Sequence, residues 1–242
     1  LNNYVLMIDD ITVMIQAQRD AAWSEVARRL AHEIKNPLTP IQLSAERIKH
    51  KLGAKLNKDD TDVLNKAVAT IVNQVDAMKT MVNEFSEYAR APKLNLELTD
   101  INKFIKEIFL LFENSGIKIS TKLSKELPKI KVDVNMMRQV LINLIQNAQD
   151  AMIGNTKTPT LQISTNKLKN YIVLSIQDNG PGFSADILKK AFEPYVTTKS
   201  HGTGLGLAIV KKIIEEHEGI ITIENIKNSG ALINIQIPIS KN

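Results

Sequence analysis

The chain of 242 residues contains no cysteine. Disulfide bonds and zinc sites built from cysteine are therefore excluded, and this absence is typical of proteins from a reducing compartment. No apolar run approaches the roughly 18 residues that a membrane-spanning helix needs, and no secretory signal peptide is recognisable. The net charge is only +5, with dispersed Lys and Arg residues. This argues against a nucleic-acid-binding surface, so we expect no nucleic-acid partner.

The residues that are present form an ordinary globular composition, 43% hydrophobic and 24% charged, which is enough for a real core. The length fits one large domain or two ordinary ones. The first residue is Leu rather than Met, so we expect more sequence upstream, where a membrane anchor could lie. The 242 residues themselves are expected to make no contact with a membrane.

Two long amphipathic helices are predicted in the first ninety residues. Apolar residues recur at steps of three and four through a helix predicted over 16–52. A polar turn follows at 53–60, and Asp60 or Thr61 is expected to cap the second helix. The same spacing then continues strictly over 64–89. A helical hairpin with one apolar face results, and dimerisation into a four-helix bundle would cover that face.

Residues 1–15 include a short apolar run at 4–8 that predicts a strand. Because an isolated strand needs a sheet, we assign 1–15 to the end of an upstream domain. Within the first helix, Pro37 and Pro40 lack the N–H group that would bond to the carbonyl four residues earlier. We therefore expect a kink in the helix next to His32.

The remainder of the chain mixes strands and helices. Strands are predicted near 117–122, 130–133, 160–168, 171–177, 219–225 and 231–238, and helices near 100–115, 135–153, 184–190 and 205–217. This order predicts an α/β sandwich, in which a mostly antiparallel sheet carries helices on one face. The chain is thus of the α+β class, with a helical domain at 16–91, a linker at 92–99 and a second domain at 100–242.

His32 is a candidate nucleophile on the first helix. It lies off the apolar seam, so its side chain should face solvent, and a neutral imidazole has a ring nitrogen free to attack phosphorus. Glu33 could hold the other ring N–H as general base, and Asn36 lies one turn further along the same face. Taken alone, a histidine in a helix is more often structural, and Glu33 and Asn36 could be ordinary surface residues.

Two glycine motifs are candidates for nucleotide binding. They are Asp178-Asn-Gly180-Pro-Gly182 at the end of a predicted strand and Gly202-Thr203-Gly204-Leu205-Gly206 at the start of a predicted helix. Glycines let the backbone approach a ligand closely, and free N–H groups at a helix N-terminus bind phosphate oxygens. The Asp178 carboxylate suits the exocyclic amine of adenine. Either motif alone could be a polar turn or a capped loop, and the chain has no Walker A or Rossmann sequence.

Asn143 and Asn147 are four residues apart and so share one face of a predicted helix. Amide oxygens are hard ligands that suit a Mg²⁺ ion bridging nucleotide phosphates. In this order, the asparagines and the two glycine motifs resemble the N, G1 and G2 boxes of the Bergerat (GHKL) ATP-binding fold. Phe192-Glu-Pro-Tyr195 resembles the F box, and together with His32-Glu33-Ile34-Lys35-Asn36-Pro37 the chain resembles the core of a sensor histidine kinase.

The resemblance implies ATP and Mg²⁺ as ligands, with the metal on Asn147. The nucleotide-binding residues that it implies are Asn143, Asn147, Asp178, Gly180, Gly182, Phe192, Lys199, Gly202, Thr203, Gly204, Leu205 and Gly206. Lys199 would belong to a mobile lid of about 183–203 and meet the terminal phosphates. His32 would be phosphorylated from Mg-ATP and would pass the phosphoryl group to an aspartate of a response regulator. Asn36 would orient water for dephosphorylation of that regulator.

Two positions qualify this resemblance. GHKL proteins that hydrolyse ATP carry a glutamate where this chain has Asn143, and because an amide cannot act as a base, hydrolysis is disfavoured. Asp150 stands where histidine kinases often have a basic residue, which places more weight on Lys199. Two alternatives remain open, namely a GHKL ATPase whose hydrolysis drives dimer closure, and a dimeric scaffold that binds nucleotide without transferring phosphate.

The segment 23–47 resembles the NtrY-type sensor kinases of nitrogen or envelope-stress regulation, which are partners of NtrX-type regulators. Residues 1–15 resemble the last strand of a PAS sensor domain. The resemblance implies a homodimer and a receiver domain of the NtrX type as partner. It also implies that the full-length protein lies at the inner membrane, with these residues in the cytoplasm.

Overall fold

The computed structural model describes residues 11–89, 94–113, 115–154, 156–199, 202–226 and 230–239, except for the side chains of 12–24. The chain divides into two compact units, residues 1–92 and 93–242. The strand predicted at 4–8 and the side chain of Trp23 lie outside the described residues. Within the described part, no helix is both long and apolar enough to cross a membrane.

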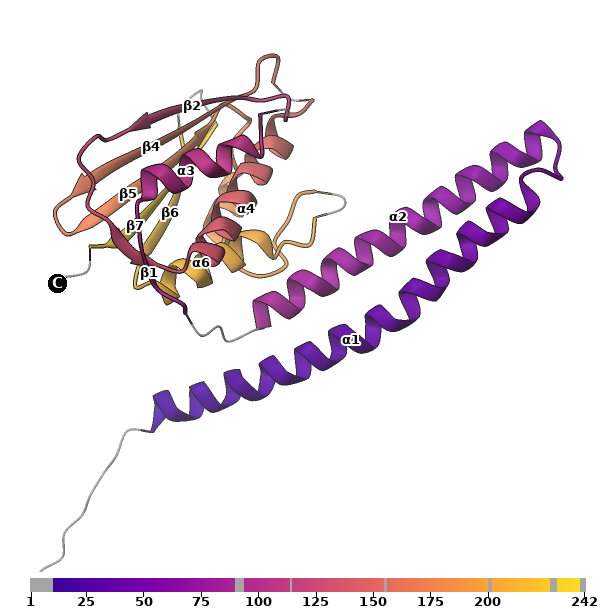
Figure 1. The fold of residues 1–242 in the computed structure, drawn as a ribbon, viewed down its shortest axis with the longest axis horizontal. Coiled ribbons are helices and arrows are strands. Elements are labelled where there is room, and N and C mark those ends of the chain that lie inside the picture. Colours follow the sequence, from indigo (N-terminus) through magenta and orange to yellow (C-terminus); the bar gives the residue numbers. More distant parts are fainter. Residues whose placement is uncertain are drawn as a thin grey trace, which may run out of the picture. The chain divides into compact units, whose positions relative to one another are not determined.

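The first unit is a hairpin of two long antiparallel helices, α1 (Thr12–Leu52) and α2 (Lys58–Ala89) (Figure 1). Helix α1 continues through Pro37 and Pro40, and its ribbon is curved rather than straight (Figure 1). The predicted hairpin is thereby confirmed.

Asn57 caps α2, and the prediction that Asp60 or Thr61 does so is wrong. The Asn57 Oδ1 atom accepts a 2.9 Å hydrogen bond from the Asp60 N–H. The Thr61 hydroxyl instead donates to the Asn57 carbonyl over 2.8 Å. Asparagine at this position satisfies an N–H group of the first turn, which is why the helix begins earlier than its apolar spacing indicates.

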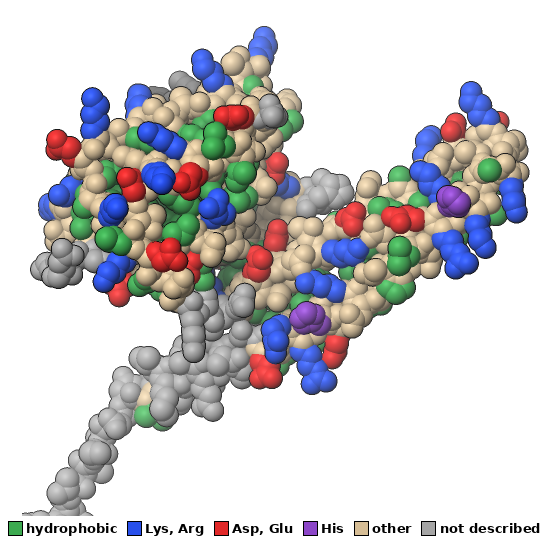
Figure 2. Space-filling model, viewed as in Figure 1, with side chains coloured by type: hydrophobic (Ala, Val, Ile, Leu, Met, Phe, Trp, Pro, Cys, Tyr) green, Lys and Arg blue, Asp and Glu red, His purple; other side chains and the backbone are tan. Residues whose placement is uncertain are grey.

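The apolar seam of the hairpin splits into two heptad lines on each helix. The lines that pack within the hairpin are buried: Ala31, Leu38 and Ala45 on α1, and Val68, Val75, Val82 and Ala89 on α2. The neighbouring lines, Ile34, Ile41 and Ile48 on α1 and Ile71 and Met78 on α2, are between 40% and 48% exposed. Figure 2 accordingly shows hydrophobic side chains among charged ones on the hairpin surface. One hairpin therefore covers only part of its apolar surface.

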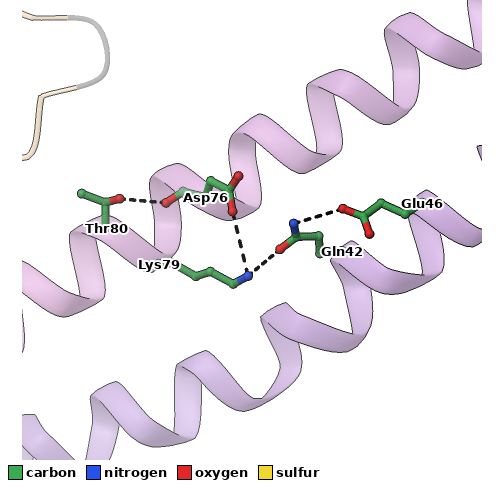
Figure 3. A network of polar contacts seen from close by, with 5 residues as sticks. All are labelled: Gln42, Glu46, Asp76, Lys79 and Thr80. Carbon is green, nitrogen blue, oxygen red and sulfur yellow. Dashed lines mark hydrogen bonds and ion pairs between the residues drawn. The ribbon is translucent and has the colours of Figure 1, made fainter.

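A polar network joins the two helices (Figure 3). The Lys79 ammonium on α2 donates to Gln42 Oε1 on α1 and lies 3.9 Å from the Asp76 carboxylate. Gln42 in turn donates to Glu46 over 3.1 Å. Because the half-buried Lys79 and Gln42 lie on different helices, their contact favours one alignment of α1 against α2.

The second unit contains a five-stranded sheet and a separate two-stranded pair. The strands are β1 (Glu97–Thr99), β2 (Lys118–Leu123), β3 (Ile130–Val132), β4 (Thr160–Leu168), β5 (Tyr171–Asp178), β6 (Ile220–Asn225) and β7 (Ala231–Pro238). The large sheet has the order β2-β4-β5-β7-β6, in which β2 and β4 are parallel and the other pairs are antiparallel. The predicted mostly antiparallel sheet is confirmed.

Helices cover one face of this sheet (Figure 1). They are α3 (Ile101–Leu110), α4 (Val134–Met152) and α6 (Gly206–Glu216), with a short α5 (Ala185–Lys190) between the last two. Residues such as Ile163, Leu174 and Ile235 are buried, and the residues that alternate with them on the other face include Ser175 and Asn234. This alternation is typical of an antiparallel sheet with one covered and one open face.

Strand β1 lies in the segment predicted to be the linker 92–99. It pairs antiparallel with β3, and just before it the Asn95 N–H donates a 3.0 Å hydrogen bond to the Asp133 carboxylate. Leu98 in this strand is 63% exposed, so β1 shows no alternation of buried and exposed residues. The segment from Asn95 onward therefore belongs to the second unit.

Candidate active site

His32 lies on α1 and is exposed, as its position off the seam predicts. Its neighbour Ala31 is buried in the hairpin. Because consecutive helical residues point about 100° apart, the imidazole is presented on the outer surface. Asn36, one turn further on, is also exposed.

Glu33, the predicted general base, is paired with Arg29. The Arg29 Nε atom donates a 3.0 Å hydrogen bond to the Glu33 carboxylate, and both side chains are mostly exposed. An exposed pair of this kind contributes at most about 1 kcal/mol. The carboxylate can therefore exchange Arg29 for another partner at low cost.

Helix α4 carries the two predicted asparagines on its half-buried face. Asn143 and Asn147 are partly accessible, while Leu144 and Ala148 are buried in the core. The helix begins at the cap residue Asp133, whose carboxylate accepts hydrogen bonds from the first turn. Burial of the apolar face fixes the rotation of α4 and so directs both amides to the same side.

Asp178 stands at the end of β5 and organises the first glycine motif. Its Oδ1 atom accepts hydrogen bonds from the Gly180 N–H at 2.8 Å and the Ala231 N–H at 3.3 Å. Burial raises the pKa of the Asp178 carboxyl group, and these donors only partly offset the effect. A Cβ atom on Gly180 would lie 3.4 Å from Met152, so this loop abuts the end of α4.

Asn225, at the end of β6, holds the loop that follows this motif. Its side chain accepts a 2.8 Å hydrogen bond from the Phe183 N–H and donates one of 2.6 Å to the Phe183 carbonyl. Gly182 has φ of +73°, and a Cβ atom there would lie 2.7 Å from Asn225 Oδ1. Nothing in the sequence singles out Asn225, because the contact spans 42 residues.

Gly230 is a further glycine of the site, and the sequence motifs do not include it. It has φ of +81°, and a Cβ atom there would lie 2.4 Å from the Asp178 carbonyl oxygen. Its place in a turn between two predicted strands was the available signal, but the turn alone does not indicate that it touches Asp178.

The second glycine motif leads into α6. Gly204 has φ of +70°, and its carbonyl accepts a 3.0 Å hydrogen bond from the Tyr195 N–H. Leu205 is fully buried, and its N–H donates to the Thr203 hydroxyl over 3.3 Å. Leu205 thus anchors the motif in the core, so that any contact from this residue to a nucleotide would come from its backbone.

Lys199 connects the segment before α6 to α4. Its ammonium donates to Asn147 Oδ1 at 3.0 Å and to Asp150 Oδ2 at 2.7 Å. A Cβ atom on Gly206 would lie 3.6 Å from the Asn147 amide nitrogen, so the N-terminus of α6 meets Asn147 from another side. Three of the predicted elements, Asn147, Lys199 and the glycine-rich helix start, therefore converge. Phe192 is half-buried in the same unit.

The donor set around Asn147 fits a hard cation. The Lys199 ammonium already lies on amide and carboxylate oxygens there, which are the oxygen types that Mg²⁺ prefers. Among the described residues, no three His, Cys, Asp or Glu side chains gather into a metal site. A metal ion at Asn147 would therefore need phosphate oxygens or water as further ligands.

Two family models match the chain. The His Kinase A (phospho-acceptor) domain matches residues 22–93, and the model described as histidine kinase-, DNA gyrase B-, and HSP90-like ATPase matches residues 132–241. Among curated proteins, the nitrogen regulation protein NtrY of Azorhizobium caulinodans is 38% identical over 243 residues, which cover 98% of this chain and 31% of NtrY. The chain thus spans about a third of the length of this relative.

Solved structures of two further proteins are similar. The nucleotide-free catalytic domain of histidine kinase ThkA is 32% identical, with 61% of this chain and 96% of that chain covered and a TM-score of 0.53. The structure of ThkA in complex with the response regulator TrrA is 30% identical to this chain. The match covers 93% of this chain and 64% of that chain, with a TM-score of 0.65. Full-length ShkA in complex with AMPPNP is 25% identical to this chain. The match covers 90% of this chain and 46% of that chain, with a TM-score of 0.70.

Proposed function

This chain belongs to the sensor histidine kinases of two-component systems, and we propose that it phosphorylates its own His32 from Mg-ATP and passes the phosphoryl group to an aspartate of a response regulator. Residues 16–91 would form the dimerisation and phosphotransfer domain. The second unit would bind the nucleotide. The short connection between them must let the nucleotide reach His32.

One observation supports the proposal most strongly. The Lys199 ammonium, the Asn147 amide and the N-terminus of α6 converge in the second unit. A cationic side chain, a hard metal ligand and free backbone N–H groups are together what a nucleoside triphosphate requires. The structure of ShkA with AMPPNP supports a nucleotide at the corresponding fold.

The remaining residues of the second unit fit adenine and a transferase. The Asp178 carboxylate would accept a hydrogen bond from the exocyclic amine of adenine, beside the backbone of Gly180 and Gly182. The amide of Asn143 cannot deprotonate water, so the terminal phosphoryl group would be kept for another acceptor. Phe192, Gly202, Thr203 and Leu205 would line or support the nucleotide from the lid side.

At His32, a neutral ring nitrogen would attack the γ-phosphorus. An N–P bond forms, the bond from phosphorus to the bridging oxygen of ADP breaks, and the proton of the other ring nitrogen passes to Glu33. Bound Mg²⁺ would supply positive charge to the phosphates during this step. Because Glu33 is held by Arg29 in an exposed pair, it can turn toward the imidazole at low cost.

We propose a second copy of this chain and a response regulator as partners. The exposed lines that include Ile41 on α1 and Met78 on α2 provide the apolar surface that a four-helix bundle would cover. The complex of ThkA with its response regulator and the similarity to NtrY support a receiver domain, of the NtrX type, as acceptor. Asn36 would orient water when the kinase dephosphorylates that regulator.

Incubation with γ-labelled ATP and Mg²⁺ tests the proposal. The protein should acquire acid-labile, base-stable label that is lost in His32→Ala and kept in His50→Ala, since His50 is a second exposed histidine on α1. Release of free phosphate without labelled protein would instead indicate an ATPase. Saturated nucleotide binding without either product would indicate a scaffold.

A further inference from the structure

Asp150 has no role in the proposed phosphoryl transfer, yet it lies three residues after Asn147 on the same face of α4. Its Oδ2 atom accepts a 2.7 Å hydrogen bond from the Lys199 ammonium. The same ammonium donates to Asn147 Oδ1 at 3.0 Å. One amide oxygen and one carboxylate oxygen of α4 therefore already hold a single positive charge between them.

We propose that Asn147 and Asp150 together form the cation site of the nucleotide-binding region, and that the Lys199 ammonium, which contacts both oxygens, competes for this site with Mg²⁺. The Mg²⁺ ion that arrives with the nucleotide replaces the ammonium, and Lys199 is released to the phosphates. Asp150 is thus a second protein ligand or water-mediated partner of the metal, and a positioning residue for Lys199. This inference rests on the proposed function, because it needs Mg-ATP at Asn147.

The chemistry of the two oxygens favours this exchange. Mg²⁺ is usually bound by one or two carboxylates together with phosphate oxygens, and Asp150 is the carboxylate that lies within reach of the same cation as Asn147. A divalent ion binds a carboxylate and an amide more strongly than an ammonium does when phosphates supply the other ligands. The nucleotide thus brings the ion that outcompetes Lys199.

The ion pair is also weak enough to exchange. The side chains of Lys199 and Asp150 are 38% and 56% exposed, and surface pairs of this kind contribute little to stability. The backbone on either side of Lys199 is held independently, because its N–H donates to the Thr197 hydroxyl at 3.1 Å and its carbonyl accepts from the Gly202 N–H at 3.2 Å. The ammonium can therefore leave α4 while its backbone turn remains.

The decisive measurement is the affinity for ATP with Mg²⁺ and with EDTA, determined calorimetrically for the wild type and for Asp150→Asn. The variant should bind metal-free ATP at least as tightly as the wild type, because a negative charge near the phosphates is removed and Lys199 is freed. The enhancement of affinity by Mg²⁺ should fall by about tenfold, the lower end of the effect of removing a supporting metal partner. An unchanged enhancement would overturn the proposal.

A matched control is Glu107→Gln, which neutralises an exposed carboxylate on α3 of the same unit. It should leave the enhancement by Mg²⁺ unaltered. If it lowers the enhancement as much as Asp150→Asn does, the effect is one of net charge and the proposed site is wrong.

Binding of Mn²⁺ without nucleotide, followed by electron paramagnetic resonance, tests the role of Lys199 separately. Lys199→Gln should bind Mn²⁺ several-fold more tightly than the wild type, and adding Asp150→Asn should abolish the gain. Equal affinity of Lys199→Gln and wild type would show that the ammonium does not occupy the cation site. Failure of the wild type to bind ATP under any condition would instead refute the proposed function, whatever the Mn²⁺ result.

Discussion

The backbone N–H of Tyr195 donates a 3.0 Å hydrogen bond to the carbonyl oxygen of Gly204, and so joins the two ends of the segment that carries Lys199. Both residues have positive φ, +66° and +70°. A non-glycine residue such as Tyr195 is strained in this conformation by about 1–3 kcal/mol. The contact is possible because Gly204 has no side chain, since a Cβ atom would lie 2.5 Å from the Tyr195 carbonyl carbon.

Gly204→Ala should weaken nucleotide binding by at least about tenfold, which corresponds to roughly 1.4 kcal/mol. The added methyl group meets backbone atoms that cannot move without separating Tyr195 from residue 204. Gly116→Ala is the matched control, because Gly116 has φ of +76° but nothing lies within 4 Å of its Cβ position. Calorimetric titration with ATP compares the two. Equal affinities in both variants would mean that this junction does not shape the nucleotide site.

Asp178→Asn should lose ATP binding while the protein stays folded. Burial raises the pKa of Asp178 in the folded state, so the ionised carboxylate opposes folding at neutral pH. That penalty disappears as the pH falls through the raised pKa. The oxygen of an asparagine side chain can still accept the hydrogen bonds from the Gly180 and Ala231 N–H groups. Its NH₂ group would then face the exocyclic amine of adenine, and two donors cannot form a hydrogen bond with each other. We expect an unchanged or higher unfolding temperature at pH 7 and no measurable ATP affinity.

The same pKa shift gives the wild type a pH dependence. Its ATP affinity should decline on acidification at a pH above the ordinary range of aspartate, because protonated Asp178 no longer offers a free carboxylate. Titration with ATP over a pH series, corrected for protonation of the nucleotide itself, measures this. If Asp178→Asn binds ATP with wild-type affinity, Asp178 does not contact the adenine.

Periodic features of the fold could be predicted from the sequence. The strands of the five-stranded sheet were predicted to within one residue, because the three central strands β4, β5 and β7 have a buried side chain at every second position over most of their length and turn residues separate the strands along the chain. Strand β1 was missed, since its three residues carry no such alternation and pair with β3 only after the chain has folded. The start of α2 was misplaced because a capping asparagine outweighed the apolar spacing.

In the candidate site, too, local patterns could be predicted from the sequence, whereas contacts between distant residues could not. Glycine motifs and asparagines four residues apart are local patterns, whereas the contacts of Lys199 with α4 join residues about fifty positions apart. No spacing rule predicts which carboxylate Lys199 meets. The Arg29–Glu33 pair is different, because oppositely charged residues at i and i+4 on a helix are expected to pair.

Asp133 links three elements of the second unit, and its loss should destabilise that unit by about 2 kcal/mol. Its carboxylate accepts hydrogen bonds from the first turn of α4 and from the Asn95 N–H, while its own N–H donates to His217 Nε2 at 2.9 Å. A lost N-cap costs about 1 kcal/mol and a further hydrogen bond about as much. Asp133→Ala is therefore expected to lower the midpoint of urea unfolding.

Asp100→Ala provides the control, since Asp100 caps α3 through one hydrogen bond to the Lys103 N–H, and it should cost about 1 kcal/mol. The pH dependence adds a second criterion. Burial alone would raise the pKa of Asp133, but its N–H donors outweigh burial and lower it. The stabilisation by Asp133 is thus complete above the ordinary pKa of aspartate and is lost as the pH falls through the lowered one. Equal stability losses in both variants would contradict the linking role.

Ile41→Glu should convert the proposed dimer into a monomer. Ile41 lies on the heptad line of α1 that the hairpin leaves 47% exposed, and a four-helix bundle would bury this line against the second copy. A carboxylate placed there would lose its water without gaining a partner, which costs several kcal/mol for each copy. The chain itself should remain helical, because Leu38 and Ala45, which pack within the hairpin, are untouched.

Leu43→Glu separates this effect from a general loss of apolar surface. Leu43 is 59% exposed, and two residues along a helix from Ile41 it points to nearly the opposite side. Light scattering coupled to size exclusion should therefore give the mass of two chains for Leu43→Glu and of one chain for Ile41→Glu at micromolar concentration. If Ile41→Glu remains dimeric while Leu43→Glu dissociates, the copies meet through the other side of α1, and the exposed heptad line needs a different partner.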